Sequence, residues 1–111
     1  MQFKEGQAVL GKIRFRDGQE PQYPRPYLVV TVTAEYIEVL NVSSIQGKDY
    51  KLAYSTNTRI NPYNPPFMKP SFVKLDSLTR VDSSLFGGLH LLAKGAVLDA
   101  QELNRIKSLI K

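Results

Sequence analysis

An arginine between two prolines is the residue of this chain best suited to chemistry. Arg25 lies in the segment Tyr23-Pro24-Arg25-Pro26-Tyr27-Leu28-Val29-Val30. Each proline fixes its own φ angle and restricts the residue before it, so the backbone at Arg25 is stiff and extended. A guanidinium held in this way is suited to binding a phosphate through two parallel hydrogen bonds. An ordinary surface ion pair accounts for the same residues, and such pairs are common.

The residue types that the chain lacks exclude several kinds of chemistry. It has no cysteine, which excludes disulfides, thiolate catalysis and cysteine metal sites. The single histidine, His90, lies in an apolar segment and is interpreted as structural, because a histidine base needs an orienting partner. Glycine-rich phosphate loops and a nucleophile elbow are also absent from the sequence. We therefore expect chemistry that uses neither a metal nor a cofactor.

Cleavage of RNA by its own 2′-hydroxyl suits the remaining side chains, because the substrate supplies the nucleophile. The protein must hold the strand in line, move two protons and stabilise a charged phosphorane. Arg25 can bind that charge through two hydrogen bonds without losing its own proton, and a hydroxyl such as that of Ser43 can donate a further hydrogen bond. Tyrosines in or near loops, such as Tyr23 and Tyr63, can stack on unpaired bases or simply pack the ends of a barrel.

Size and charge set limits on the compartment and the partner. The 111 residues suit one domain spanning 1–111, with 42% hydrophobic and 23% charged residues. A formal net charge of +5 favours a polyanionic partner. No apolar run approaches the ~20 residues that span a bilayer, and residues 1–6 lack the apolar core of a signal peptide. The lack of cysteine favours a reducing cytoplasm.

Hydrophobic alternation predicts a mainly β chain that ends in a helix. The expected strands cover residues 7–15, 26–33, 36–44, 50–54, 71–75 and 78–82. A tight turn is expected near Ala34-Glu35, and the four prolines within residues 61–70 exclude regular structure there. Asp99 and Glu102 fit a helix N-terminus, followed at helical spacing by Leu103, Ile106, Leu109 and Ile110. Short strands, proline-rich loops and a terminal helix predict a small, strongly curved β-barrel.

Four short segments in order resemble the MazF/PemK family of bacterial toxin–antitoxin toxins. They are Lys4-Glu5-Gly6-Gln7 before the first strand, Gly18-Gln19-Glu20 before Arg25-Pro26-Tyr27-Leu28-Val29, Pro70 to Asp82, and the ending Lys94-Gly95-Ala96-Val97 with Glu102-Leu103 and Ile106-Lys107. The likeness covers nearly the whole chain. The chain departs from the family between Tyr50 and Pro70, which is richer in Asn, Tyr and Pro.

The resemblance implies an SH3-like barrel of the CcdB/MazF type that forms a homodimer. It implies a metal-independent, sequence-specific endoribonuclease that cuts single-stranded RNA and is neutralised by a cognate antitoxin. Arg25 matches the catalytic arginine of the family, and Ser43 takes the place of its threonine, with Ser44 as the alternative if the register shifts by one.

Further RNA-binding residues follow from the same resemblance and from the composition of the loops. Gln19 and Glu20 match loop positions that touch RNA in the family, and Asp76 falls at a nearby acidic position. Arg59 and Tyr63 fit an RNA-facing loop or a solvated one, and Tyr23 is counted with the RNA-binding residues. The alternative to an endoribonuclease is a non-catalytic toxin or RNA-binding module on the same fold, which binds RNA or a protein target such as gyrase without cleavage.

Overall fold

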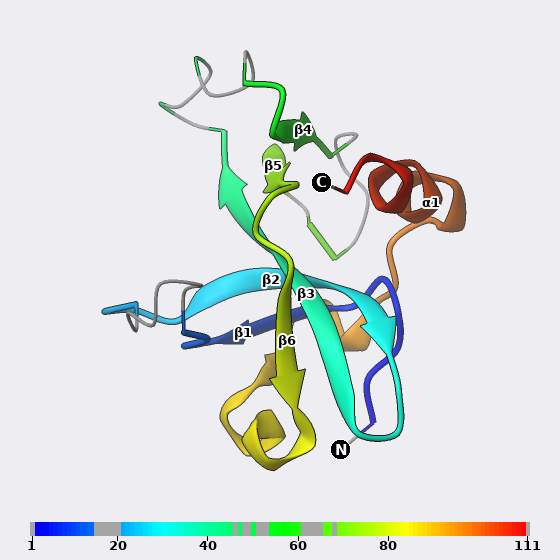
Figure 1. Ribbon diagram of the computed structural model, residues 1–111. Helices are drawn as coiled ribbons and strands as arrows, with labels where there is room; N and C mark the ends of the chain where they lie inside the picture. The colour runs from blue at the N-terminus through cyan, green and yellow to red at the C-terminus, as the bar shows by residue number, and fades with distance from the viewer. Residues whose placement is uncertain are drawn as a thin grey trace.

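The computed structural model describes residues 2–14, 21–45, 47, 50, 54–60, 66–67 and 69–110, and within them the chain is mainly β (Figure 1). Seven strands are described: β1 (Ala8–Gly11), β2 (Arg25–Val32), β3 (Tyr36–Ser44), β4 (Asn57–Arg59), β5 (Ser71–Lys74), β6 (Thr79–Asp82) and β7 (His90–Leu91). Helix α1 (Ala100–Leu109) follows two short 3₁₀ helices, η2 (Ser83–Gly88) and η3 (Ala93–Gly95). The predicted combination of a mainly β chain with a C-terminal helix is confirmed.

Strand β3 is the centre of the sheet, and its neighbours are all antiparallel to it. The strand order is β4-β5-β3-β2-β1-β7, and β6 also pairs with β3. β2 pairs with β3 from Val32↔Ile37 to Tyr27↔Asn41 on one edge. On the other edge β6 pairs with the first half of β3, and β5 pairs with its last three residues. The pairing therefore changes along β3, which bends away from β2 near its end (Figure 1).

The break between β5 and β6 is bridged by a serine hydroxyl. Opposite this break the backbone N–H of Asn41 donates to the Ser77 hydroxyl oxygen at 2.8 Å. That hydroxyl in turn donates to the carbonyl of Lys74 at 2.6 Å. A buried strand N–H must find a partner, and a side-chain oxygen replaces the missing ladder acceptor here. Because the Ser77 hydroxyl takes the place of a backbone acceptor, β5 and β6 together can pair with β3 along its bend.

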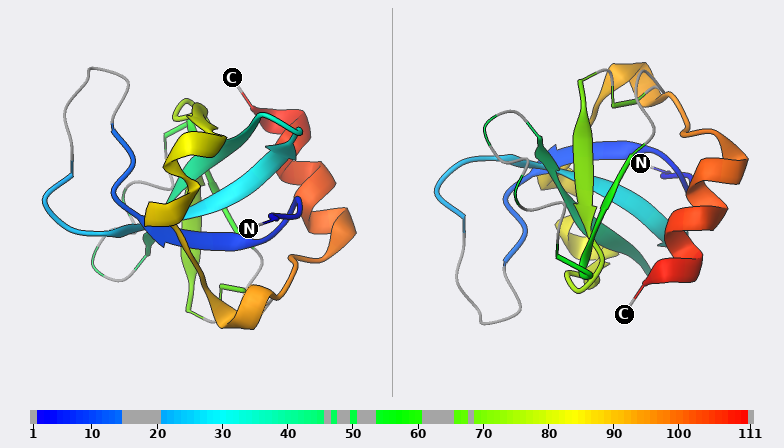
Figure 2. Two further views of the ribbon diagram at one scale, coloured as in Figure 1. Left: turned by 90° about the horizontal axis from the view of Figure 1, so that it is seen from below. Right: turned by 90° about the horizontal axis from the view of Figure 1, so that it is seen from above.

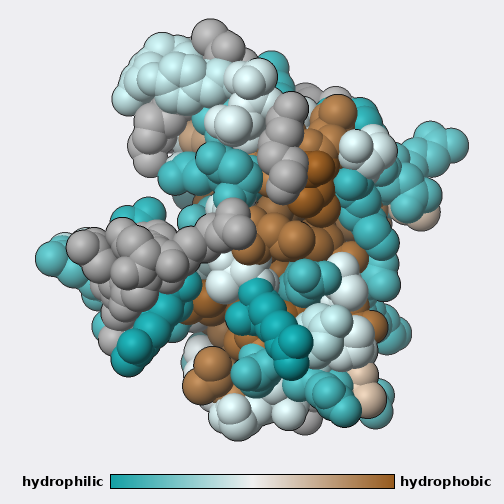
Figure 3. Space-filling model, in the orientation of Figure 1, coloured by the Kyte–Doolittle hydropathy of each residue, from teal (hydrophilic) through white to brown (hydrophobic). Residues whose placement is uncertain are grey.

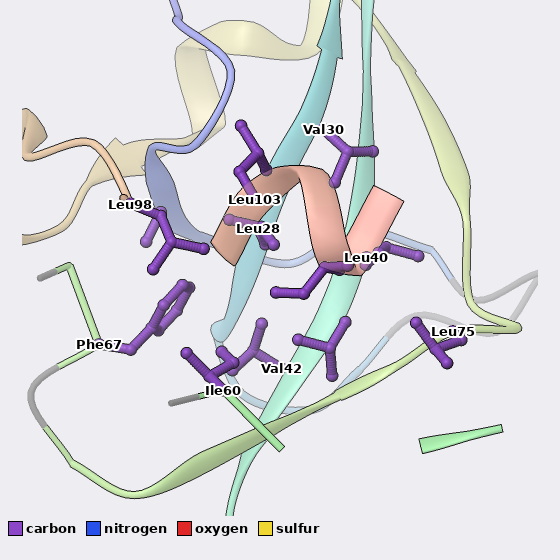
Figure 4. Close-up of a cluster of buried hydrophobic side chains, with 12 residues drawn as sticks. Leu28, Val30, Leu40, Val42, Ile60, Phe67, Leu75, Leu98 and Leu103 are labelled. Carbon is purple, nitrogen blue, oxygen red and sulfur yellow. The ribbon is translucent and has the colours of Figure 1, made fainter. Parts of the chain in front are cut away.

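The sheet buries side chains on both faces, so the central residues of β2 and β3 are mostly apolar. Figure 4 shows Leu28, Val30, Leu40 and Val42 directed toward the helix residue Leu103. We call this cluster the α1-side core; it consists of Ala8, Leu28, Val30, Leu40, Val42, Ile60, Phe67, Val73, Leu75, Leu98, Leu103 and Ile106. Both views in Figure 2 place α1 along this face of the strands. Side chains of this size contribute about 1.5–3 kcal/mol each when they leave water.

The opposite face carries the second cluster, which we call the η2-side core. It consists of Phe3, Val9, Ile13, Tyr27, Val29, Ile37, Val39, Val81 and Leu89, with Phe86 of η2 packed against it. The Phe3 and Phe86 rings meet edge to face, with centroids 4.9 Å apart. Odd-numbered residues at the start of β2 and along β3 therefore face η2, and even-numbered ones face α1.

Several strand boundaries differ from the prediction. The strand expected over 7–15 is shorter in the structure, since β1 starts at Ala8 and ends at Gly11, where its pairing with β2 also ends. β4, β7 and η2 were not expected. Of the strand expected over 50–54, Tyr50 and Tyr54 lie outside any strand, and residues 51–53 lie outside the described ones.

The predicted start of the helix is confirmed in its cap. The Asp99 carboxylate accepts hydrogen bonds from the backbone N–H groups of Gln101 and Glu102 at 3.1 and 3.2 Å. Leu103 and Ile106 are buried as expected, but Leu109 is 40% exposed and does not join the core. Within the described part of the chain, neither α1 nor a 3₁₀ helix is long and apolar enough to span a membrane.

Candidate functional site

Arg25 is the first residue of β2 and is exposed to solvent. It pairs with Gly11 of β1, so it continues the face on which Tyr27 and Val29 enter the η2-side core. Burial raises the pKa of the Tyr27 phenol, and the positive charge of Arg25 opposes that rise. The guanidinium therefore lies near the Tyr27 hydroxyl. Among the residues described by the structure, no carboxylate forms an ion pair with Arg25.

Ser43 lies on the same face of the sheet as Arg25. The β2–β3 register ends at Tyr27↔Asn41, and two further residues along each strand lead to Arg25 and Ser43. Beyond the last recorded pair β3 turns toward β5, where Ser43 is paired with Phe72. Arg25 and Ser43 thus occupy the two arms of a fork formed by the start of β2 and the end of β3 (Figure 1).

Strand parity separates the two serines left open by the sequence. Ser43 follows Val39 and Asn41 on the η2 side, whereas Ser44 follows Leu40 and Val42 on the α1 side. Ser44 is paired with Ser71 instead of Phe72. Only Ser43 therefore shares a face with Arg25.

Arg59 lies in the same cross-strand row as Ser43. Phe72 is paired with Ser43 on one side and with Arg59 on the other, so the three residues share one face. Adjacent strands lie about 4.8 Å apart, which places the backbones of Ser43 and Arg59 about 10 Å from each other. Phe72 between them is fully buried and offers no stacking surface, whereas Arg59 is exposed.

The remaining predicted residues are spread around this fork. Asp76 is exposed in the break between β5 and β6, beside the Ser77 that binds Asn41, and so lies across β3 from β2. Tyr23 is 69% exposed in the segment before β2, which projects from the body of the chain in both views of Figure 2. Gln19, Glu20 and Tyr63 lie outside the described residues.

A groove beside Arg25 was not predicted from the sequence. It has a volume of about 600 Å³ and lies between residues 12–14, β6 and η2. The exposed, buried, exposed pattern of Lys12, Ile13 and Arg14 was visible as strand alternation, but nothing in the sequence indicated that β6 and η2 form the other walls. In the lower half of Figure 3, hydrophobic surface shows between hydrophilic patches over this part of the molecule.

No metal centre and no family assignment arise from these observations. Within the described residues, no group of three or more histidine, cysteine, aspartate or glutamate side chains is placed to hold a metal ion. Comparison with known proteins assigns the chain to no family, since no protein-family model and no curated protein matches it.

Proposed function

We propose that this protein is a metal-independent endoribonuclease that cuts single-stranded RNA, with Arg25 and Ser43 at its catalytic centre. The observation that supports the proposal is an exposed arginine on proline-braced backbone, sharing one sheet face with a hydroxyl on the other arm of the β2–β3 fork. A guanidinium without a carboxylate partner among the described residues keeps its donors for a substrate phosphate.

The proposed reaction uses the 2′-hydroxyl of the RNA as nucleophile. Its oxygen attacks the adjacent phosphorus, the bond from phosphorus to the 5′-oxygen breaks, and the products are a 2′,3′-cyclic phosphate and a 5′-hydroxyl. Arg25 stabilises the negative charge of the phosphorane and hands a proton to the departing 5′-oxygen, which is more basic than a neutral guanidine, and Arg25 then regains a proton from the solvent. The 2′-hydroxyl proton passes to water. The Ser43 hydroxyl donates a hydrogen bond to a phosphoryl oxygen.

The fold and partners implied by the MazF/PemK resemblance belong to the same proposal. The bent sheet with a core on each face is compatible with an SH3-like barrel. A homodimer, a cytoplasmic location and an acidic antitoxin that neutralises the protein complete the hypothesis. A disordered acidic chain suits a protein of net charge +5, because it can wrap a basic surface.

RNA cleavage in the presence of EDTA tests the proposal. We expect the purified protein to cut a long RNA and leave 2′,3′-cyclic phosphate ends. Arg25→Ala should lower the rate at least ~100-fold, a usual cost of removing a transition-state stabiliser. Lys4→Ala removes an equal charge beyond the other end of β2 and should leave the rate unchanged.

Ser43 is tested against its neighbour. Ser43→Ala should slow cleavage by about 10-fold, as expected for one lost hydrogen bond of about 1.4 kcal/mol to a charged group, and Ser43→Thr should restore it. Ser44→Ala, on the opposite face, should have no such effect. Absence of cleavage, or an Arg25→Ala variant as active as the parent, would refute the proposal.

A non-catalytic RNA-binding module is the second candidate. It is favoured by the groove beside Arg25, whose described lining contains three cationic side chains and no carboxylate or histidine to act as a base. RNA bound and protected by the parent protein, with no cut ends, would select this alternative.

A further inference from the structure

The groove beside Arg25 combines an apolar floor with cationic sides. Its volume of about 600 Å³ is in the range of small-molecule sites. The described residues that line it are Lys12, Ile13, Arg14, Thr79, Arg80, Val81, Ser84, Leu85, Gly87, Gly88 and Leu89. No acidic residue is among them, so the groove favours a ligand that is negatively charged.

The cationic side chains are arranged along two walls. Lys12 and Arg14 flank the buried Ile13, so their Cα atoms are at most about 7 Å apart, and neither forms an ion pair with a described residue. That spacing is similar to the distance between successive phosphates of an extended single strand. On the facing wall Arg80 bonds to Asp82 at 3.0 Å and lies 4.0 Å from the centre of the Tyr36 ring. Asp82 offsets much of the Arg80 charge, so Lys12 and Arg14 carry the attraction for an anion.

The apolar part of the groove is accessible rather than sealed in the core. Leu85 is 62% exposed, which is high for a leucine that adjoins other apolar side chains. Gly87 and Gly88 leave the neighbouring backbone uncovered, since a Cβ added at either would meet no atom within 4 Å. A flat, weakly polar group can therefore rest on Leu85 and reach the glycine backbone.

The groove also lies close to Arg25, one strand away in the sheet. Gly11 pairs with Arg25, and Leu89 and the Gly88 carbonyl, which both line the groove, pack closely against Gly11. Lys12 follows Gly11 directly. A strand of RNA held at Arg25 thus reaches the groove by crossing one β-strand, about 4.8 Å wide.

We propose that the groove binds one unpaired nucleotide of the RNA strand, next to the linkage held by Arg25. The base rests on Leu85, and the phosphates that flank it lie against Lys12 and Arg14. The inference takes its ligand, RNA, from the proposed function. An acidic peptide with an apolar side chain matches part of this chemistry, but a nucleic acid strand also presents a further phosphate to the neighbouring Arg25, so RNA is favoured.

Binding of a short, labelled 2′-O-methyl RNA of mixed sequence tests the inference, because this probe cannot be cleaved. Leu85→Asp should weaken binding at least 10-fold by placing a negative charge on the floor. Leu109→Asp is the matched control, since Leu109 is also exposed (40%) but lies on α1. Replacing one nucleotide of the probe with an abasic one should reduce the difference in affinity between the Leu85→Asp variant and the parent, because the base that rests on Leu85 is then missing.

The salt dependence gives a second, independent measurement. Removing both Lys12 and Arg14 should reduce the slope of log K against log salt by about 1.4, at about 0.7 per phosphate contact of a single strand. Equal weakening by Leu85→Asp and Leu109→Asp, or an unchanged slope, would overturn the inference.

The same assays separate this inference from the proposed function. If Leu85→Asp binds as well as Leu109→Asp while Arg25→Ala abolishes cleavage, only the groove inference fails. If the groove variants lose RNA but the parent makes no cuts, only the endoribonuclease fails. Binding of an acidic peptide, with no binding of the RNA probe, would refute the inference and identify a protein partner instead.

Discussion

Replacing Arg105 with alanine should weaken the attachment of helix α1 to strand β4 and lower the stability of the fold. The Arg105 guanidinium donates to Glu102 at 2.5 Å, to the Thr58 hydroxyl at 2.9 Å and to the Arg59 carbonyl at 2.6 Å. The Glu102 side chain is 3% exposed, so it depends on its partners within the protein. Arg105→Ala removes this cation and leaves the carboxylate buried.

The magnitude follows from the burial of the two partners. Removing one member of a fully buried ion pair costs about 3–5 kcal/mol, because the other charge stays out of water without compensation. The Arg105 side chain is 38% exposed, and water can enter the space it leaves, so we expect a loss of about 2–3 kcal/mol. Lys107 and Glu5 form the matched control, because their side chains are 36% and 42% exposed. Lys107→Ala should cost less than about 1 kcal/mol.

Urea unfolding of both variants, followed by circular dichroism, measures the difference. Glu102→Gln, alone and combined with Arg105→Ala, completes a double-mutant cycle. Removing the buried charge should recover part of the stability lost in Arg105→Ala, so the combined variant should be more stable than the sum of the two losses predicts. If Arg105→Ala and Lys107→Ala have the same free energy of unfolding, the reasoning from burial is wrong.

Two further substitutions test the neighbourhood of the site. Gly11→Ala should lower the free energy of unfolding in urea by about 1–3 kcal/mol, because the new Cβ lies 2.6 Å from a Leu89 methyl carbon and 3.1 Å from the Gly88 carbonyl oxygen. Gly87→Ala is the control: its Cβ meets no atom within 4 Å, so it should cost less than about 0.5 kcal/mol. Equal losses of stability in the two variants would contradict the argument from contacts. Tyr27→Phe should protect against alkaline unfolding, because burial raises the Tyr27 pKa, so the folded state holds this proton more tightly and the protein loses stability as the pH rises above about 10. Urea titrations at about pH 9 and 11 should show a smaller decrease in the free energy of unfolding for the variant than for the parent. Equal decreases would show that Tyr27 does not cause the alkaline loss of stability.

The sequence predicted best those strands and helices whose bounds are determined by their own residues. β3 has the bounds predicted from its β-branched residues and alternation, and the Asp99 cap marked the start of α1. β4 and β7 have three and two residues, too few for a period to be recognised. They exist because neighbouring strands offer them hydrogen bonds, which is information that lies elsewhere in the chain.

In the candidate site too, some features follow from the local sequence and others from contacts between distant parts of the chain. The extended backbone of Arg25 follows from the prolines on either side. The choice between Ser43 and Ser44 needs the register of β3 with β5, because a shift of one residue reverses the face. The groove needs β6 and η2 brought against residues 12–14, a long-range contact that no local pattern encodes.

The distance between Arg25 and Ser43 depends on the packing of two separate cores, the η2-side core and the α1-side core. Tyr27, next but one to Arg25, is anchored in the η2-side core, and Val42, beside Ser43, is anchored in the α1-side core. Residues 25–26 of β2 do not pair with β3, whose pairing with β2 ends at Tyr27↔Asn41, so the opening of the fork depends on how each core holds its own strand. Packing that shifts either strand by about 1 Å would misalign the two groups, and misplacement of that size can cost about 100-fold in rate. If the proposed chemistry holds, the cores therefore act on activity as well as on stability, through the angle at which β2 and β3 separate.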